Sequence, residues 1–126
     1  MIFDCISGFP GLETAVPLLL TEVNKGRISL TKYVQLTSEN PARAWRIYPK
    51  KGCITVGSDG DFTIVDMNKM GKVEPAKFLS KAKWSPFDGF EVKGGPVYTV
   101  VRGKVVMDHG SVQTAPSGKM VTPIPA

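Results

Sequence analysis

Hydrophobic side chains in the first part of the chain recur at helical spacing. Within residues 12–23 the apolar positions return every three or four residues, which predicts an amphipathic helix. Pro17 lies inside this pattern, so we expect an offset or kinked first turn. Gly26 follows the last apolar position and is a suitable residue for ending the helix.

A second and a third helix are predicted before residue 48. Ser29 is a candidate N-cap for the second, which should turn several apolar side chains inward. Residues 37–41 read as a break, after which Asn40 would cap a short third helix with Pro41 at its first position. The side chains expected to face inward are Leu30, Tyr33, Val34 and Leu36.

The pattern changes to that of strands after residue 49. Residues 53–56 are strand-like, residues 57–60 form a polar turn, and residues 61–66 alternate as a half-buried strand does. Residues 67–95 show little periodicity and contain many glycines, prolines and lysines. We therefore expect a long irregular connection there.

Two β-branched runs, residues 97–101 and 104–107, are separated only by Arg102 and Gly103. This spacing predicts a β-hairpin with a two-residue turn. Residues 111–126 show no pattern and should extend over a surface. Helices first and hairpins second, without alternation, indicate an α+β fold.

Composition narrows the function classes. The chain has 126 residues, enough for one core, and its 42% hydrophobic and 21% charged residues are typical of globular proteins. The formal net charge of +5 comes from scattered lysines and arginines, which favours a solvated surface and no nucleic-acid partner. Cys5 and Cys53 fit no metal or redox motif. No secretory signal or membrane-spanning run is present, so we expect a cytoplasmic protein without a membrane partner.

The residues that could carry chemistry are few. His109 is the single histidine and follows a hairpin, where a solvated side chain is the usual case. Asp59 and Asp61 flank a turn glycine and are expected to bind local backbone amides. The glycines of residues 7–11 could let backbone amides approach a ligand at a helix start, although a plain loop-to-helix turn has the same composition. The residues alone indicate no catalytic group and no metal ligand.

Six segments, in order, resemble those of cyclic amidohydrolases, the group of dihydroorotases, allantoinases and dihydropyrimidinases or hydantoinases. Each is weak alone, but their order and spacing are specific, and together they span nearly the whole chain. The segments are residues 8–20 (GFPGLETAVPLLL), 26–30 (GRISL), 37–43 (TSENPAR), 51–62 (KGCITVGSDGDF), 85–89 (SPFDG) and 99–106 (TVVRGKVV).

The resemblance implies a C-terminal fragment of such an enzyme. Residues 1–48 would be the terminal helices of a TIM (β/α)8 barrel, and residues 49–126 would be hairpins and tail of a small composite β-sandwich. The family uses one or two zinc ions, which turn bound water into hydroxide and polarise the scissile carbonyl. Its ligands are several histidines, often a carboxylated lysine, and an aspartate. This chain offers neither the histidines nor the aspartate, since Asp4 lacks the expected following histidine.

One substrate contact does map onto this chain. In the family, the loop before the first of these helices presents backbone groups to the ring amide, and by position this loop falls on Ser7 and Gly8, beside Phe9 and Pro10. We therefore expect a dihydroorotase-like fragment that contacts a small cyclic amide but is not catalytic alone. The cofactor expected for this chain is none, with zinc in the parent enzyme.

Two other interpretations stay open. The chain could be a non-catalytic binding or assembly module related to dihydropyrimidinases, or a truncated reading frame. Helices without their barrel and hairpins without their sandwich would expose apolar surface and strand edges. We therefore expect aggregation, or association as a homo-oligomer or with another subunit, unless a partner supplies the rest.

Overall fold

The computed structural model describes residues 8–113, 115–116 and 118–125. The predicted residue Ser7 and the cysteine Cys5 lie outside these residues. Along the chain, the α-helices precede the strands. The elements are α1 (Leu12–Asn24), α2 (Leu30–Val34), the π-helical η2 (Gln35–Glu39), α3 (Asn40–Ala44), β1 (Phe62–Lys72), the 3₁₀-helical η3 (Pro75–Lys77), β2 (Glu91–Val101), β3 (Lys104–Asp108) and β4 (Ser111–Val112).

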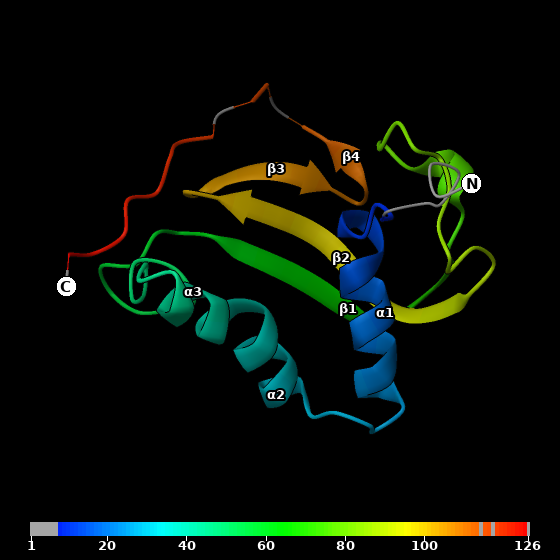
Figure 1. Cartoon of the computed structure of the whole chain (residues 1–126), viewed down its shortest axis with the longest axis horizontal. Coiled ribbons are helices and arrows are strands. Elements are labelled where there is room, and N and C mark those ends of the chain that lie inside the picture. Colours follow the sequence, from blue (N-terminus) through cyan, green and yellow to red (C-terminus); the bar gives the residue numbers. More distant parts are fainter. Residues whose placement is uncertain (1–7, 114, 117, 126) are drawn as a thin grey trace, which may run out of the picture.

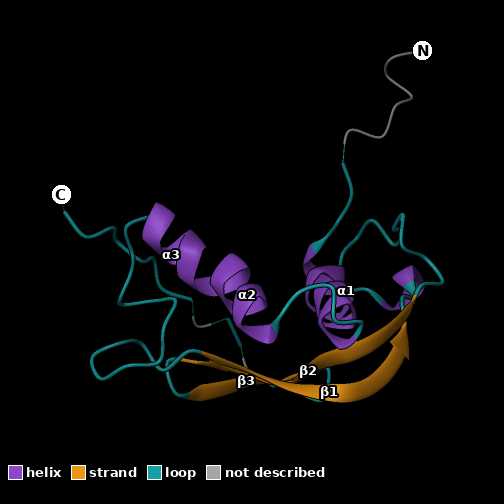
Figure 2. Ribbon diagram, turned by 90° about the horizontal axis from the view of Figure 1, so that it is seen from below, coloured by secondary structure: helices purple, strands orange, loops and turns teal. Residues whose placement is uncertain are grey.

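The strands form one antiparallel sheet in the order β1-β2-β3-β4, so each strand pairs with the next along the chain (Figure 1). The helices all lie on one side of this sheet (Figure 2). The molecule therefore has two layers, and the α+β prediction is confirmed. The assignment of residues 1–48 and 49–126 to two different domains of a larger enzyme stays a prediction.

Helix α1 runs without interruption through Pro17. It ends as predicted, because Gly26 adopts a φ of 73°. The Gly26 amide donates to the carbonyl of Val23 at 2.9 Å, and the Arg27 amide donates to that of Glu22 at 3.0 Å. This pair of bonds is the Schellman ending, which satisfies carbonyls that the helix itself leaves free.

The predicted break at residues 37–41 is wrong, because α2, η2 and α3 follow one another without a gap. Asn40 has helical torsion angles, φ −63° and ψ −44°, and donates its amide to Gln35, five residues back. Pro41 has no N–H, and its ring would press on the carbonyl four residues earlier in an α-helix. The wider π turn before Pro41 accommodates that ring within a continuous helix.

The start of this helical run is as predicted, since Ser29 Oγ accepts the Lys32 amide at 3.1 Å. The prediction of inward-facing apolar side chains is wrong in this chain. Three of them are about half exposed, namely Leu30 at 48%, Val34 at 47% and Leu36 at 48%. These three side chains are thus only partly covered by the other described residues.

Residues 53–56 are not a strand but a succession of turns and bends. Gly52, at φ 87°, brings this loop so close to α3 that a Cβ there would lie 2.5 Å from the Cβ of Ala42. The loop is thus held against a helix instead of pairing with a strand. Ile54 and Val56, the apolar residues that suggested a strand, are 84% and 103% exposed.

The sheet extends beyond the predicted strands. β1 continues to Lys72 and β2 already begins at Glu91, so the irregular connection covers only residues 73–90. Met70, Gly71 and Lys72 pair with Lys93, Val92 and Glu91, respectively. Pairing between strands that are distant in sequence, which periodicity does not report, decides these positions.

The predicted hairpin turn is confirmed. Val101 pairs with Lys104, and the two residues between them, Arg102 and Gly103, have φ of 47° and 75°. Positive φ at both central positions matches the right-handed twist of the flanking strands. The next turn, at His109 and Gly110, repeats this geometry with φ of 46° and 89°.

Helix α1 docks on the sheet through one short stretch of β2. Leu20 is fully buried, and a Cβ on Gly94 would lie 2.8 Å from the Cβ of Leu20. Thr21 Oγ1 accepts the Lys93 amide at 2.9 Å, and Asn24 Nδ2 donates to the Lys93 carbonyl at 2.9 Å. Gly94 thus permits α1 to approach β2 closely, and two hydrogen bonds to the backbone of Lys93 fix the position of the helix along the strand.

The hydrophobic core lies beside this junction. Val73, Phe78 and Val92 are buried together, and Leu18 of α1 and Phe87 pack against them. The core therefore joins α1, the curved end of the sheet and the irregular connection 73–90.

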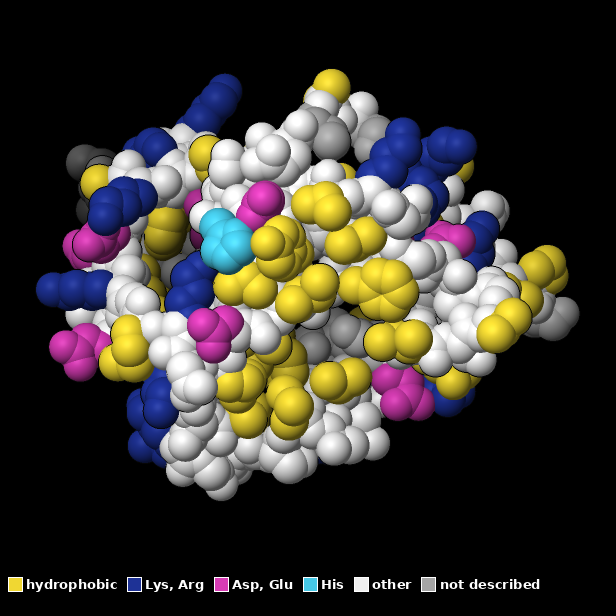
Figure 3. Space-filling view, turned by 180° about the vertical axis from the view of Figure 1, so that it is seen from behind, with side chains coloured by type: hydrophobic (Ala, Val, Ile, Leu, Met, Phe, Trp, Pro, Cys, Tyr) yellow, Lys and Arg dark blue, Asp and Glu magenta, His cyan; other side chains and the backbone are white. Residues whose placement is uncertain are grey.

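The opposite face of the sheet is uncovered and largely apolar (Figure 3). Phe62 pairs with Val100 and Ile64 with Tyr98, which places these side chains on one face. Phe62 and Ile64 are 39% and 49% exposed. Such a surface fits the expectation of aggregation or association, which stays a prediction. No helix in the described parts of the chain is long and apolar enough to cross a membrane.

The close approach at Gly94 can be tested by Gly94→Ala. The added methyl group would overlap Leu20, and alanine would have to adopt the positive φ that Gly94 has. We therefore expect the free energy of unfolding to fall by roughly 2–4 kcal/mol. Gly26→Ala is the matched control, because Gly26 has a similar φ of 73° but open space around it. It should cost only about 1–2 kcal/mol. Equal losses in thermal or denaturant unfolding would contradict a steric role for Gly94.

Candidate functional site

The predicted substrate contact lies where the chain leads into α1. Of its two residues only Gly8 is described, and Gly8 is exposed, with nothing within 4 Å of an added Cβ. Gly11 forms the N-cap, and its carbonyl accepts the amides of Thr14 at 3.2 Å and Ala15 at 2.9 Å. Among the described residues, nothing therefore crowds the Cβ side of Gly8, and the thirteen-residue helix α1 follows shortly after it.

An aromatic cluster borders this loop. The ring of Phe9 makes edge-to-face contacts with Trp84, at a centroid distance of 6.5 Å, and with Phe87, at 5.6 Å. Phe87 in turn contacts Phe90 at 5.6 Å. Three of the four rings come from connection 73–90, so this connection forms one wall beside the loop that leads into α1.

Glu13 ties the same connection to the first turn of α1. Its carboxylate accepts the backbone amides of Leu79 and Ser80, each at 3.0 Å. A glutamate in a first helical turn is favoured by the helix dipole alone, so its type and position carried no sign of a partner 66 residues away. Sequence reasoning missed this residue for that reason.

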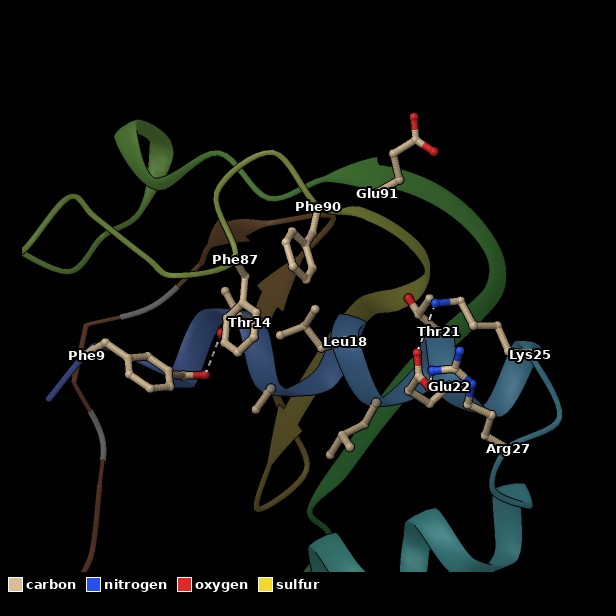
Figure 4. A pocket seen from close by; sticks show the side chains of 13 residues that line it. Phe9, Thr14, Leu18, Thr21, Glu22, Lys25, Arg27, Phe87, Phe90 and Glu91 are labelled. Carbon is tan, nitrogen blue, oxygen red and sulfur yellow. Dashed lines mark hydrogen bonds and ion pairs between the residues drawn. The ribbon is translucent and has the colours of Figure 1, made fainter.

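A groove of about 610 Å³ follows α1 from this cluster towards the end of the helix (Figure 4). Phe9, Leu18, Phe87 and Phe90 line its apolar end. At the other end lie Glu22, Lys25 and Arg27.

The charged residues at the other end of the groove pair with one another, with two cations sharing one carboxylate. Glu22 accepts hydrogen bonds from Lys25 Nζ at 3.0 Å and from Arg27 Nη1 at 2.6 Å. These two bonds, with that from Lys25 the larger effect, lower the pKa of the Glu22 carboxyl. The apolar end is thus the distinctive part of the groove.

Asp59 and Asp61 were expected to bind local backbone amides in their turn, but their carboxylates bind more distant groups. Both carboxylates bind Lys51 Nζ, Asp59 at 2.8 Å. Asp61 also accepts the amide of Arg102 at 2.8 Å, from the turn between β2 and β3. The three charged residues therefore clamp the loop after α3 to the far hairpin, and their role is structural.

Burial by itself would raise the pKa of Asp61, but the hydrogen bonds from Lys51 and from the Arg102 amide outweigh it and lower that pKa. Burial would likewise lower the pKa of Lys51, and its bonds to the two carboxylates raise it instead. Both groups are held in their charged forms at neutral pH.

The other candidates are peripheral. His109 lies exposed in the turn between β3 and β4, where its ring contacts Asp108 and the edge of Tyr98. Cys53 is half-buried, and its thiol donates to the carbonyl of Pro49 at 3.3 Å. Within residues 8–113, 115–116 and 118–125, no three histidines, cysteines or carboxylates come together as a metal site. The zinc that the resemblance implies does not fit the described residues.

Comparison with known proteins decides the family. Residues 4–106 match the amidohydrolase family. The chain belongs to this family.

The similar proteins include a hydantoinase and a dihydroorotase. The chain is 50% identical over 107 residues to the L-hydantoinase of Paenarthrobacter aurescens, and 45% identical over 111 residues to the dihydroorotase of Methanothermobacter thermautotrophicus. These alignments cover 84% and 88% of this chain, but only 23% and 26% of those enzymes. The chain thus spans about a quarter of the length of the curated relatives that it matches.

Solved structures agree with the sequence comparison. The L-hydantoinase (dihydropyrimidinase) from Arthrobacter aurescens superimposes with a TM-score of 0.86 at 46% identity, over 90% of this chain and 25% of that one. A D-hydantoinase superimposes with a TM-score of 0.79 at 37% identity, over 85% and 23%. The arrangement of α1, the sheet and connection 73–90 therefore corresponds to part of a larger amidohydrolase.

The clamp around Lys51 should make the stability of this amidohydrolase chain depend on pH. Folding lowers the pKa of Asp61. The ionised Asp61 carboxylate therefore stabilises the fold above the ordinary pKa of 3.8, and this stabilisation is lost as the pH falls through the lowered pKa. Asp61→Asn should reduce the free energy of unfolding at pH 7 by about 1–3 kcal/mol. It should also flatten the fall in stability below about pH 4. Denaturant unfolding at pH 7 and pH 3 measures both, and an unchanged pH profile would contradict the assignment.

Proposed function

We propose that this chain forms part of a cyclic amidohydrolase, an enzyme that hydrolyses a C–N bond of a ring amide such as dihydroorotate, hydantoin or allantoin. The observation that carries the proposal is the match to hydantoinases and dihydroorotases along 83–91% of the chain. A dihydroorotase-like parent is the form that the sequence segments favour, and the L-hydantoinase at 50% identity supports the wider group.

The contribution of this chain would be binding, not bond cleavage. Ser7 and Gly8 would offer backbone amide and carbonyl groups to the ring, since a cyclic amide presents one donor and one acceptor side by side. The open surroundings of Gly8 and its place before α1 support this role. Backbone groups can bind a ring without a side chain, and a glycine lets the ring approach them closely.

The catalytic metal would be held elsewhere in the complete enzyme. Zinc, as one or two ions, would supply the attacking hydroxide when bound. The described part of this chain contains no cluster that could bind it. We therefore propose that the chain is not catalytic alone. In the complete enzyme its helices would close a TIM barrel and its sheet would belong to a β-sandwich, in a cytoplasmic protein.

Replacement of the aligned segment of the Paenarthrobacter aurescens L-hydantoinase by this chain tests the proposal. We expect the chimaera, assayed with its metal, to open a cyclic amide at a rate within about tenfold of that of the natural enzyme. This range corresponds to a difference of ~1.4 kcal/mol in activation free energy. Hydantoin, dihydroorotate and allantoin should be compared as substrates. The isolated chain should open none of them.

A folded chimaera that is inactive on all three rings would contradict the proposal. It would instead favour a non-catalytic assembly module. Stoichiometric zinc in the isolated chain would contradict the separate statement that this chain holds no metal.

The contact at Gly8 can be tested in the same chimaera with Gly8→Ala. A methyl group there meets none of the residues that the structure describes, so the melting temperature should not change. It would, however, keep a ring away from the backbone, and KM should rise by about tenfold, which corresponds to ~1.4 kcal/mol of binding. Gly118→Ala, likewise in open space, is the control and should leave KM unchanged. Equal KM values for the two variants would contradict a substrate contact at Gly8.

A further inference from the structure

Connection 73–90 is held at two points, one on the first turn of α1 and one on the loop that leads into it. The first is polar, where the Glu13 carboxylate accepts two successive amides, those of Leu79 and Ser80. The second is aromatic, where the Phe9 ring meets Trp84 and Phe87. Figure 4 shows the rings of Phe9 and Phe87 beside the first turn of α1.

The polar point of attachment is needed because the core ends just before it. Phe78 is 8% exposed and belongs to the core, whereas the next residue, Leu79, is 78% exposed. Beyond Phe78 the connection continues largely at the surface through residues 79–83 before the aromatic cluster begins. The two bonds to Glu13 therefore fix the stretch that leads from the core to Trp84.

A carboxylate suits this task. Two hydrogen bonds to a charged acceptor are each worth more than bonds between neutral groups. They also fix direction, because two successive backbone amides must both point at one carboxylate. A chain of contacts results, from Glu13 through connection 73–90 to the ring of Phe9, and Phe9 is the neighbour of Gly8.

We propose that Glu13 is a positioning residue, which holds connection 73–90 against Phe9 and thereby keeps the backbone of Gly8 in its substrate-binding position. The inference rests on the proposed function of Gly8. Without Glu13 the aromatic wall keeps its packing on the core through Phe87 but loses its polar attachment, and the loop adopts its binding conformation for a smaller fraction of the time. Apparent affinity falls by that fraction, while the rate of the bound complex does not.

The test uses Glu13→Ala and Glu13→Gln in the hydantoinase chimaera, with Glu22→Ala as the matched control. Glu22 lies on the same helix, and its carboxylate binds the side chains of Lys25 and Arg27 at the far end of the groove. We expect Glu13→Ala to raise KM about tenfold with kcat unchanged within twofold. Glu13→Gln keeps one strong acceptor oxygen and should give an intermediate KM. Glu22→Ala should leave KM unchanged.

Hydrogen exchange gives a second, independent reading in the full chain and in the chimaera. The amides of Leu79 and Ser80 should exchange about tenfold or more faster in Glu13→Ala, and at the original rate in Glu22→Ala. The combination of faster exchange and a raised KM supports the positioning role.

The failures are distinguishable. A chimaera with the original Glu13 that hydrolyses no cyclic amide overturns the proposed function, and with it this inference. An active chimaera whose KM is unchanged by Glu13→Ala overturns the inference alone. The same holds if kcat falls in proportion to the loss of melting temperature, since that marks a merely structural role.

Discussion

The contact between Leu20 of α1 and Gly94 of β2 sets the positions of the elements around it. At this point the helix and the strand approach as closely as an absent side chain permits, and a Cβ on Gly94 would overlap Leu20. Thr21 and Asn24 hold the amide and the carbonyl of Lys93, the residue just before Gly94. Displacing α1 along β2 would break both hydrogen bonds, so these contacts fix the position of α1 on the sheet.

The consequence for the proposed site follows from geometry. With its register set by β2, α1 carries its first turn to connection 73–90, where Glu13 and Phe9 meet that connection. The position of the loop before α1 thus depends on contacts with connection 73–90, which is distant in sequence. Meanwhile the outer face of the sheet and the apolar groove along α1 remain uncovered in a chain that spans about a quarter of its relatives. Under the proposed function, the rest of the enzyme would cover these surfaces.

Features that depend on neighbouring residues could be predicted from the sequence. The turn at Arg102 and Gly103, the ending of α1 at Gly26 and the cap at Ser29 follow from local backbone chemistry, and the structure confirms them. The ordered segments also predicted the family correctly. The role of Ser7 and Gly8 is still a prediction, because it concerns a ligand.

Features that depend on distant residues could not be predicted. The lengths of β1 and β2 are set by pairing across connection 73–90, and the non-strand conformation of residues 53–56 by contact with α3. The bonds of Glu13 to Leu79 and Ser80, and of Asp61 to Arg102, join residues 66, 67 and 41 positions apart. Neither periodicity nor composition carries such information, since each carboxylate also suits its local helix or turn.

A crystal structure of the hydantoinase chimaera with a bound ring-amide inhibitor tests the central claim most directly. The account predicts that the backbone of Ser7 or Gly8 lies within about 3 Å of the amide N–H or carbonyl of the ring. It also predicts that Glu13 keeps both of its bonds to connection 73–90 in that complex. A ring bound without any contact to this loop would contradict the account.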